Sequence, residues 1–124
     1  MTEKYYSIHE MMSLFDVSSR TIRYYEELGL IQSLERELPN QQRTFTDSQR
    51  RRLKLILRGK RLGFSLNEIK EMVDLVEKNP TGEEEKRRII AYADQKLQEI
   101  EEKIQELQTT KEEILAHRQR YLSE

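Results

Sequence analysis

The chain has 124 residues, of which 35% are apolar and 36% charged, and its formal net charge is −1. This composition offers little apolar material for a large enzyme core and suits helices that keep one side in water. The absence of cysteine excludes disulfides and thiolate metal sites. The absence of a long apolar run or a signal-like N-terminus predicts a cytoplasmic chain without membrane contact.

The N-terminal residues predict a short helix from Ile8 to Phe15, with Ser7 as its N-cap. Ile8, Met11, Met12 and Phe15 recur at three- and four-residue spacing, which places them on one side of a helix. Serine is a preferred N-cap, because its side chain accepts a bond from a backbone N–H of the first turn. The sequence Asp-Val-Ser that follows predicts a short turn.

A second helix is expected from Ser18, its N-cap, to Leu28, with Gly29 ending it. Ile22 and Leu28 are expected to face inward, with help from Tyr25. Two short helices joined by a tight turn are typical of a helix-turn-helix, whose second helix enters the major groove of DNA. Arginine binds guanine edges or phosphates bidentately, and Thr and Tyr hydroxyls bond to phosphates. The candidate DNA contacts on the outward face are Arg20, Thr21, Arg23 and Tyr24.

Residues 30–45 lack a helical period and predict a hairpin or an extended loop. Thr46 and Gln49 then form a capping-box pattern, which opens a third helix that reaches about Leu62. Gly63 ends that helix. These elements follow the helix-turn-helix directly, so we expect them to belong to the same domain.

The third helix lies in a strongly basic part of the chain. Residues 43–61 hold eight Lys or Arg and one acidic residue, Asp47, for a net charge of +7. The near-neutral total therefore hides a local basic patch. We interpret the run Arg50–Arg52 either as a solvated helix face or as phosphate contacts. On an ideal helix, five basic side chains project within an arc of about 100°: Arg50, Arg51, Lys54, Arg58 and Arg61.

Two more capping-box patterns open the remaining helices. Ser65 with Glu68 begins a fourth helix that ends near Lys78, and Thr81 with Glu84 begins a fifth. Nothing interrupts the fifth helix between residue 83 and the end, so it is expected to be roughly 60 Å long. We place the domain boundaries at residues 1–76 for a DNA-binding domain, 77–82 for a linker and 83–124 for a dimerisation helix.

Apolar residues of the fifth helix recur every three or four positions over about four heptads, which indicates a coiled coil. A helix this long cannot bury such a seam alone, so pairing with a second copy is favoured over folding back on the third and fourth helices. The flanking charges allow a parallel or an antiparallel pair; an antiparallel pair centred near 107–111 would set Ile104 against Ile114. Lys111 and Arg118 interrupt the seam. The candidate dimerisation residues are Ile90, Leu97, Ile100, Ile104, Leu107, Ile114 and Tyr121.

The stretch "YSIHEMMSLFDVSSRTIRYYEELGLI" resembles the N-terminal signature of the MerR family of bacterial transcription regulators. The resemblance continues through "NQQRTFTDSQRRRLKLILRGKRLGFSLNEIKEMVDL" and covers about residues 5–76. It implies a mainly α fold: a winged helix-turn-helix, a second helix pair, and a long helix that forms an antiparallel homodimer. It also implies binding to a palindromic promoter, where the dimer bends and untwists double-stranded DNA so that RNA polymerase can use both promoter elements. The contacts that the resemblance carries over are Arg20, Thr21, Arg23, Tyr24, Arg43 and Lys60, to which the basic stretch adds Arg61.

The chain departs from the family pattern in its wing, the loop between the second and third helices. The family usually has Asn-Gly-Tyr-Arg there, whereas this chain has Asn40-Gln41-Gln42-Arg43 and so lacks the glycine of the tight turn. Family members that sense metals use cysteines, so we expect neither a metal nor another cofactor here. Whether a small-molecule effector exists stays open. The segment "RLKLILRGKRLGFSLNEIKEM" is similar to regulators of branched-chain amino-acid and acyl-group breakdown, which would suggest an acyl-type effector.

Two other function classes compete with regulation. A coiled-coil scaffold protein could use the same basic stretch to bind an acidic partner. An enzyme has almost no support, because we find no nucleophile–base pair, phosphate-binding glycine loop or metal cluster in the sequence. The two histidines, His9 and His117, are expected to be surface or interface residues.

Overall fold

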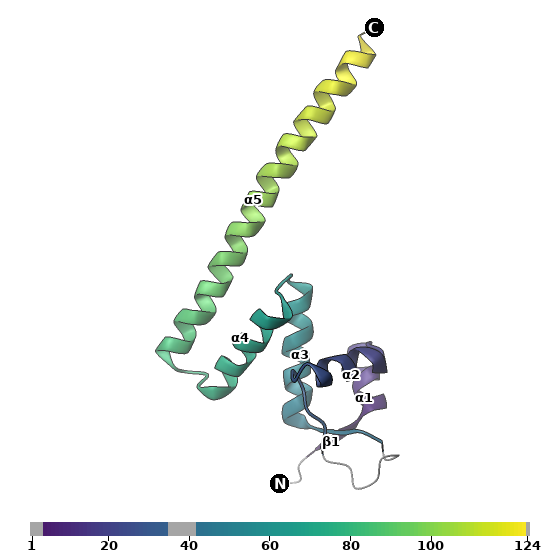
Figure 1. Cartoon of the computed structure of the whole chain (residues 1–124), viewed down its shortest axis with the longest axis vertical. Helices are drawn as coiled ribbons and strands as arrows, with labels where there is room; N and C mark the ends of the chain where they lie inside the picture. The colour runs from purple at the N-terminus through teal and green to yellow at the C-terminus, as the bar shows by residue number, and fades with distance from the viewer. Residues whose placement is uncertain (1–3, 35–41, 124) are drawn as a thin grey trace. The chain divides into compact units, whose positions relative to one another are not determined.

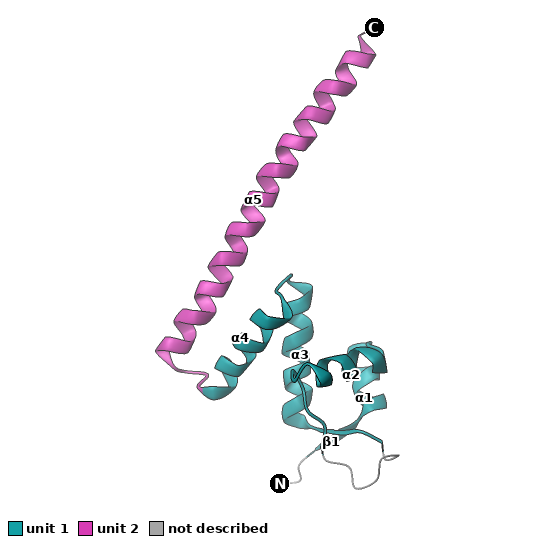
Figure 2. Cartoon of the chain, in the orientation of Figure 1, with its two compact units in different colours: residues 1–78 teal, residues 79–124 magenta. Residues whose placement is uncertain are grey.

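The computed structural model describes residues 4–34 and 42–123 and confirms the mainly helical fold (Figure 1). The chain divides into two compact units, residues 1–78 and residues 79–124 (Figure 2). Among the described residues, no helix is long and apolar enough to span a membrane. The elements are β1 (Tyr5–Ser7), α1 (Ile8–Phe15), α2 (Ser19–Glu27), β2 (Thr44–Thr46), α3 (Asp47–Arg61), α4 (Leu66–Lys78) and α5 (Glu83–Leu122).

Serine caps begin three of the helices as expected. Ser7 and Glu10 form a reciprocal capping box, in which the Glu10 N–H donates to Ser7 Oγ and the Ser7 N–H donates to Glu10 Oε1, both at 3.1 Å. Ser18 Oγ accepts from the Thr21 N–H at 3.1 Å. The box of Ser65 and Glu68 is also complete. These bonds satisfy backbone donors that have no partner inside the helix.

Thr46 caps α3, but its capping box is only half formed. Its hydroxyl accepts from the Gln49 N–H at 3.3 Å. The Gln49 side chain does not return the bond: its Oε1 accepts from the Gln32 N–H at 2.8 Å. Gln49 therefore joins α3 to the chain after α2.

The capping box expected for Thr81 and Glu84 is wrong. The N-cap of α5 is Gly82, which has no side-chain cap bond, and the Thr81 hydroxyl donates to Asn79 Oδ1 at 3.5 Å. Because α5 begins one residue later than the pattern predicts, Thr81 lies outside cap position. Three acidic residues in the first turn complement the positive end of the helix dipole instead: Glu83, Glu84 and Glu85.

A two-stranded antiparallel sheet that the sequence did not predict joins the N-terminus to the residues before α3. Tyr6 of β1 pairs with Phe45 of β2. The segment 30–45, expected to be a hairpin or an extended loop, thus contributes its last residues to a strand whose partner lies about 40 positions away. Residues 35–41 of that segment lie outside the described residues.

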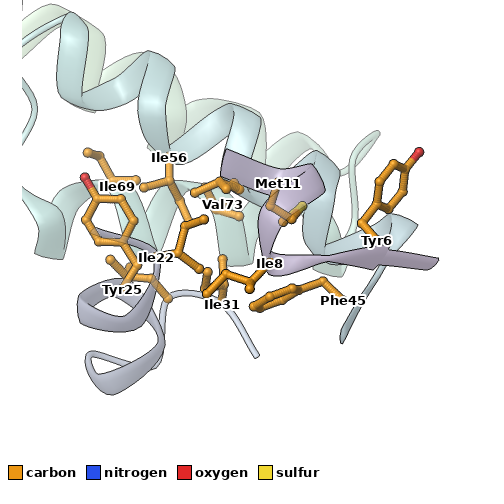
Figure 3. Packing of buried hydrophobic residues seen from close by; sticks show 12 residues of the cluster. Tyr6, Ile8, Met11, Ile22, Tyr25, Ile31, Phe45, Ile56, Ile69 and Val73 are labelled. Carbon is orange, nitrogen blue, oxygen red and sulfur yellow. The ribbon is translucent and has the colours of Figure 1, made fainter. Parts of the chain in front are cut away.

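The core of residues 1–78 gathers side chains from both strands and from α1 to α4 (Figure 3). Tyr25 is buried as expected. Leu28 is not: it is 41% exposed, because it is the C-cap of α2 and Leu30, 1% exposed, takes the core position. Gly29, at φ +76°, reverses the chain between them. The fully buried large side chains are Met11, Ile22, Leu30, Phe45, Leu53, Ile56 and Ile69.

Gly29 and Gly63 end α2 and α3 in the same way. The Leu30 N–H donates to Tyr25 O at 2.9 Å and the Gly29 N–H to Glu26 O at 3.0 Å, which is the Schellman pattern. The bonds around Gly63 repeat this pattern. Both glycines have positive φ, which other residues adopt at a cost.

Arg52 is the one buried charged residue among those described, with 7% exposure. Its Nε donates to the backbone oxygen of Leu30, which follows α2. Its Nη1 donates to Glu77 Oε2 at 2.7 Å and its Nη2 to Asp74 Oδ1 at 2.9 Å, both on α4. Arg52 is therefore neither solvated nor available to phosphate, and it joins α3 to α4 and to the end of the helix-turn-helix.

Asp47 holds β1 against the start of α3. The Tyr6 hydroxyl donates to Asp47 Oδ1 at 3.2 Å, and Arg50 Nε donates to the same oxygen at 2.7 Å. The Arg50 guanidinium also lies 5.7 Å from the centre of the Tyr6 ring. The hydrogen bond from Arg50 is the main reason why the pKa of Asp47 is lowered.

Helix α5, described by itself, is regular over 40 residues, as the heptad pattern predicts. Its side chains are mostly exposed and none is buried. The seven candidate dimerisation residues are between 43% and 69% exposed, with Ile100 the least and Leu107 the most. His117 and Tyr121 stack edge to face with ring centres 5.3 Å apart. Taken by itself, α5 thus leaves its apolar seam uncovered.

Replacing Arg52 by methionine should lower the free energy of unfolding by about 2–3 kcal/mol, because Leu30 O, Asp74 and Glu77 all lose their donor. Urea unfolding followed by circular dichroism measures this. Arg58→Met is the matched control: Arg58 is exposed on the same helix, so its replacement should change stability by less than about 0.5 kcal/mol. Equal effects of the two replacements would contradict the role given to Arg52.

Asp47→Asn should make unfolding more favourable near neutral pH and have less effect in acid. The folded-state pKa of Asp47 is lowered, so the ionised carboxylate stabilises the fold above its unfolded-state pKa of about 3.9. That stabilisation is lost as pH falls through the lower, folded-state pKa. Thermal unfolding midpoints of the two proteins should therefore converge below about pH 4. A difference that stays constant over the pH range would show that Asp47 does not act through its charge.

Candidate nucleic-acid interface

Helix α2 has one buried side and one exposed side. Ile22 and Tyr25 lie in the core. Arg20, Arg23 and Tyr24 are exposed, and Tyr24 has 49% of its surface accessible. Spacing along an α-helix places these three on the side opposite the core. The structure therefore brings three of the four predicted recognition-helix contacts together on one exposed face.

Thr21, the fourth predicted contact, is half-buried at the start of α2. Its hydroxyl lies 3.1 Å from Ser18 Oγ, the atom that also caps the helix. A hydroxyl can donate and accept at once, so this bond leaves Thr21 with capacity for a second partner. Thr21 thus combines a local role in the cap with a position at the edge of the exposed face.

Tyr24 and Tyr25 are adjacent but have different surroundings. Their ring centres are 6.1 Å apart, with the planes tilted by 42°. Burial, and to a lesser extent the neighbouring Tyr24, raises the pKa of Tyr25. Tyr25 therefore stays protonated at neutral pH in the core, whereas Tyr24 is half exposed to solvent.

Arg43, predicted to contact DNA from the wing, lies against the recognition helix. Its Nε donates to Glu26 Oε2 at 2.8 Å, and both side chains are about three-quarters covered. The other carboxylate oxygen of Glu26 accepts from the Ser33 hydroxyl. Sequence reasoning missed Glu26 and Ser33, because no local pattern links residues that are 7 and 17 positions apart.

The basic stretch of residues 43–61 is partly neutralised within the fold. Arg52 is held in the core, Arg50 pairs with Asp47, and Arg43 pairs with Glu26. Helical periodicity could have identified Arg52 as buried, since it shares a face with Leu53 and Ile56. The basic side chains that remain exposed are Arg51, Lys54, Arg58, Lys60 and Arg61.

Lys60 and Arg61 lie in the last turn of α3. They are roughly 20 Å along the helix axis from the Thr46 cap. Cations in this position also complement the negative end of the helix dipole. The candidate contacts thus lie on two different helices, α2 and α3. Within the described residues, no cluster of three His, Asp or Glu side chains could hold a metal ion.

Two protein-family models match the chain, and each covers more than half of it. The model described as MerR HTH family regulatory protein matches residues 6–75. The model described as MerR, DNA binding matches residues 50–117. A curated relative, the HTH-type transcriptional regulator CueR of Escherichia coli O6:H1, is 32% identical over 111 residues, which span 89% of this chain and 78% of the relative.

Solved structures share the fold. The transcription regulator PbrR691 from Ralstonia metallidurans CH34, crystallised in complex with lead(II), matches with a TM-score of 0.76 and 25% identity over 92% of this chain and 86% of that one. HiNmlR, a MerR family regulator lacking the sensor domain and bound to promoter DNA, matches with a TM-score of 0.58 and 24% identity over 85% of this chain and 76% of that one. The two family models and the CueR relative show that the chain belongs to the MerR family of helix-turn-helix transcription regulators, whose members bind DNA.

Proposed function

We propose that this regulator acts as a homodimer that places two copies of α2 in successive major grooves of a palindromic promoter. The observation that carries the proposal is the exposed face of Arg20, Arg23 and Tyr24 on a firmly capped helix. Two arginines can read guanine edges or grip phosphates, and the Tyr24 hydroxyl can bond to a phosphate. The wing residue Arg43 and the α3 residues Lys60 and Arg61 add contacts to the backbone outside the groove.

The proposed dimer forms through α5 in antiparallel orientation. The uncovered apolar seam supports it, because a stripe of this length needs a partner. An antiparallel pair centred near 107–111 sets Ile104 against Ile114, and the seam cations Lys111 and Arg118 extend past the apolar residues to reach water. A two-fold symmetric pair presents two recognition helices, which matches a palindromic site.

On the promoter, the dimer bends and untwists the spacer between the two elements that RNA polymerase reads. Deforming a duplex costs several kcal/mol, which phosphate contacts must offset. The exposed stripe of Arg51, Lys54, Arg58 and Arg61 supports such contacts, since α3 displays it on the side opposite the core. The remaining partners in the proposal are RNA polymerase and a small-molecule effector. The action on RNA polymerase is tested by in vitro transcription from a promoter that the protein binds, with and without the protein.

Arg23→Ala should weaken binding to the preferred duplex by about 1–3 kcal/mol and relax the base preference at one position of each half-site. The duplex is one selected by the wild-type protein from a random pool, and fluorescence anisotropy measures binding. Arg87→Ala on α5, which also removes one exposed arginine, is the control and should leave binding nearly unchanged.

The salt dependence of duplex binding distinguishes a transcription regulator from a scaffold protein. Specific binding should weaken steeply as salt rises and still favour the selected site over random duplex. Binding that depends on salt but shows no sequence preference would instead favour the scaffold class, in which the basic patch holds an acidic partner.

Ile104→Glu should dissociate the dimer, because each copy would bury a carboxylate against Ile114 of its partner at a cost of more than about 3 kcal/mol. Sedimentation equilibrium measures the association. Gln105→Glu introduces the same group one position away from the seam and should leave the dimer intact. A full-strength dimer of Ile104→Glu would refute the proposed seam.

A further inference from the structure

The two ends of the wing are tied to each other and to the helix-turn-helix by bonds that the sequence did not predict. We define the wing base as Ser33, Leu34, Arg43 and Thr44. The Leu34 N–H donates to Thr44 O at 2.8 Å, which joins its two sides. The Ile8 N–H, at the start of α1, donates to Arg43 O at 3.2 Å.

Glu26 connects this wing base to the recognition helix. One of its carboxylate oxygens accepts from the Ser33 hydroxyl and the other from Arg43 Nε, so each side of the wing base has one bond to α2. The pair with Arg43 is mostly covered, with 27% and 22% of the two side chains exposed. Bonds in such surroundings are less screened than those at the open surface.

The bond to Glu26 uses only one edge of Arg43. A guanidinium has five N–H donors in a fixed, planar arrangement, and the bond to Glu26 through Nε uses one of them. Holding one edge of the plane sets the direction of the other. Glu26 can thus orient Arg43 without preventing it from binding a phosphate.

We propose that Glu26 is a positioning residue for DNA binding: its carboxylate orients Arg43 and locks the wing base to α2, so that both engage the duplex as one unit. The inference rests on the proposed function, because it assigns a role within that interface. Pre-ordering two contact regions lowers the entropy that binding would otherwise cost. Glu26 itself makes no contact with DNA in this arrangement.

Neutralising Glu26 distinguishes this role from that of an ordinary surface acid. A carboxylate that merely lies near DNA repels phosphates, so replacing it by an amide should tighten binding. A positioning carboxylate acts in the opposite direction. Glu26→Gln should therefore weaken binding to the selected duplex roughly tenfold, equivalent to about 1.4 kcal/mol. Glu27→Gln, at the adjacent exposed acid of the same helix, is the matched control and should leave binding unchanged or tighten it.

The effect of Glu26 should depend on Arg43. In an Arg43→Gln background there is no guanidinium to orient, so adding Glu26→Gln should cause no further loss. Glu26→Asp, which keeps the charge, should bind more tightly than Glu26→Gln. Arg43→Lys offers a second, independent measurement: a lysine has one compact ammonium and cannot both pair with Glu26 and reach a phosphate in the same way, so it should also bind roughly tenfold more weakly.

The full chain is used throughout, with circular dichroism to show that each variant is folded, and anisotropy with the selected duplex to measure affinity. If the wild-type protein selects no preferred duplex, the proposed function itself fails. If the wild type selects one but Glu26→Gln binds as tightly as it or more tightly, the positioning role is overturned. Should Glu26→Gln fail to fold, unchanged binding by Arg43→Lys would overturn it equally.

Discussion

The buried guanidinium of Arg52 connects parts of the DNA-binding unit that are far apart in sequence. From α3 it binds the backbone just after α2 and two carboxylates of α4. Burying a charge is costly unless every polar atom finds a partner, and here Nε, Nη1 and Nη2 each have one. The position of the recognition helix relative to the second helix pair therefore depends on this side chain as well as on the apolar core.

Hydrogen bonds between residues far apart in sequence also hold α2 in place. Glycine in the left-handed conformation after Leu28 turns the chain so that Leu30 enters the core and its carbonyl meets Arg52. Glu26, one turn earlier, receives bonds from both sides of the wing base. The buried and paired residues of α2 thus hold one side of the helix against the core and the wing base. The opposite face stays exposed to solvent. That division explains why Tyr24 and Tyr25, adjacent in sequence, differ so much in exposure.

Helix α5 follows a different constraint. Taken by itself, it has no buried residue, and its apolar seam is exposed along the helix. An isolated helix gains little from propensity alone, and most helical stability in proteins comes from packing an apolar face. The proposed dimer satisfies that requirement and, by its symmetry, couples two recognition helices that would individually bind weakly.

The basic side chains of residues 43–61 divide into two groups. Arg43, Arg50 and Arg52 pair with acidic residues inside the fold, and the others stay exposed.

The helices could be predicted from sequence, since their apolar spacing, serine caps and terminating glycines are local signals that act within a few residues. For the same reason the exposed face of α2 and the seam of α5 follow from residue spacing alone. Contacts between distant residues do not: the β1–β2 pairing, the Glu26–Arg43 pair and the Arg52 network each span 17 or more positions. The sequence by itself thus determined which helices form and which faces they expose. Only the tertiary structure decided which distant partners Arg43 and Arg52 bind, because that depends on which carboxylates and carbonyls packing brings within hydrogen-bond distance.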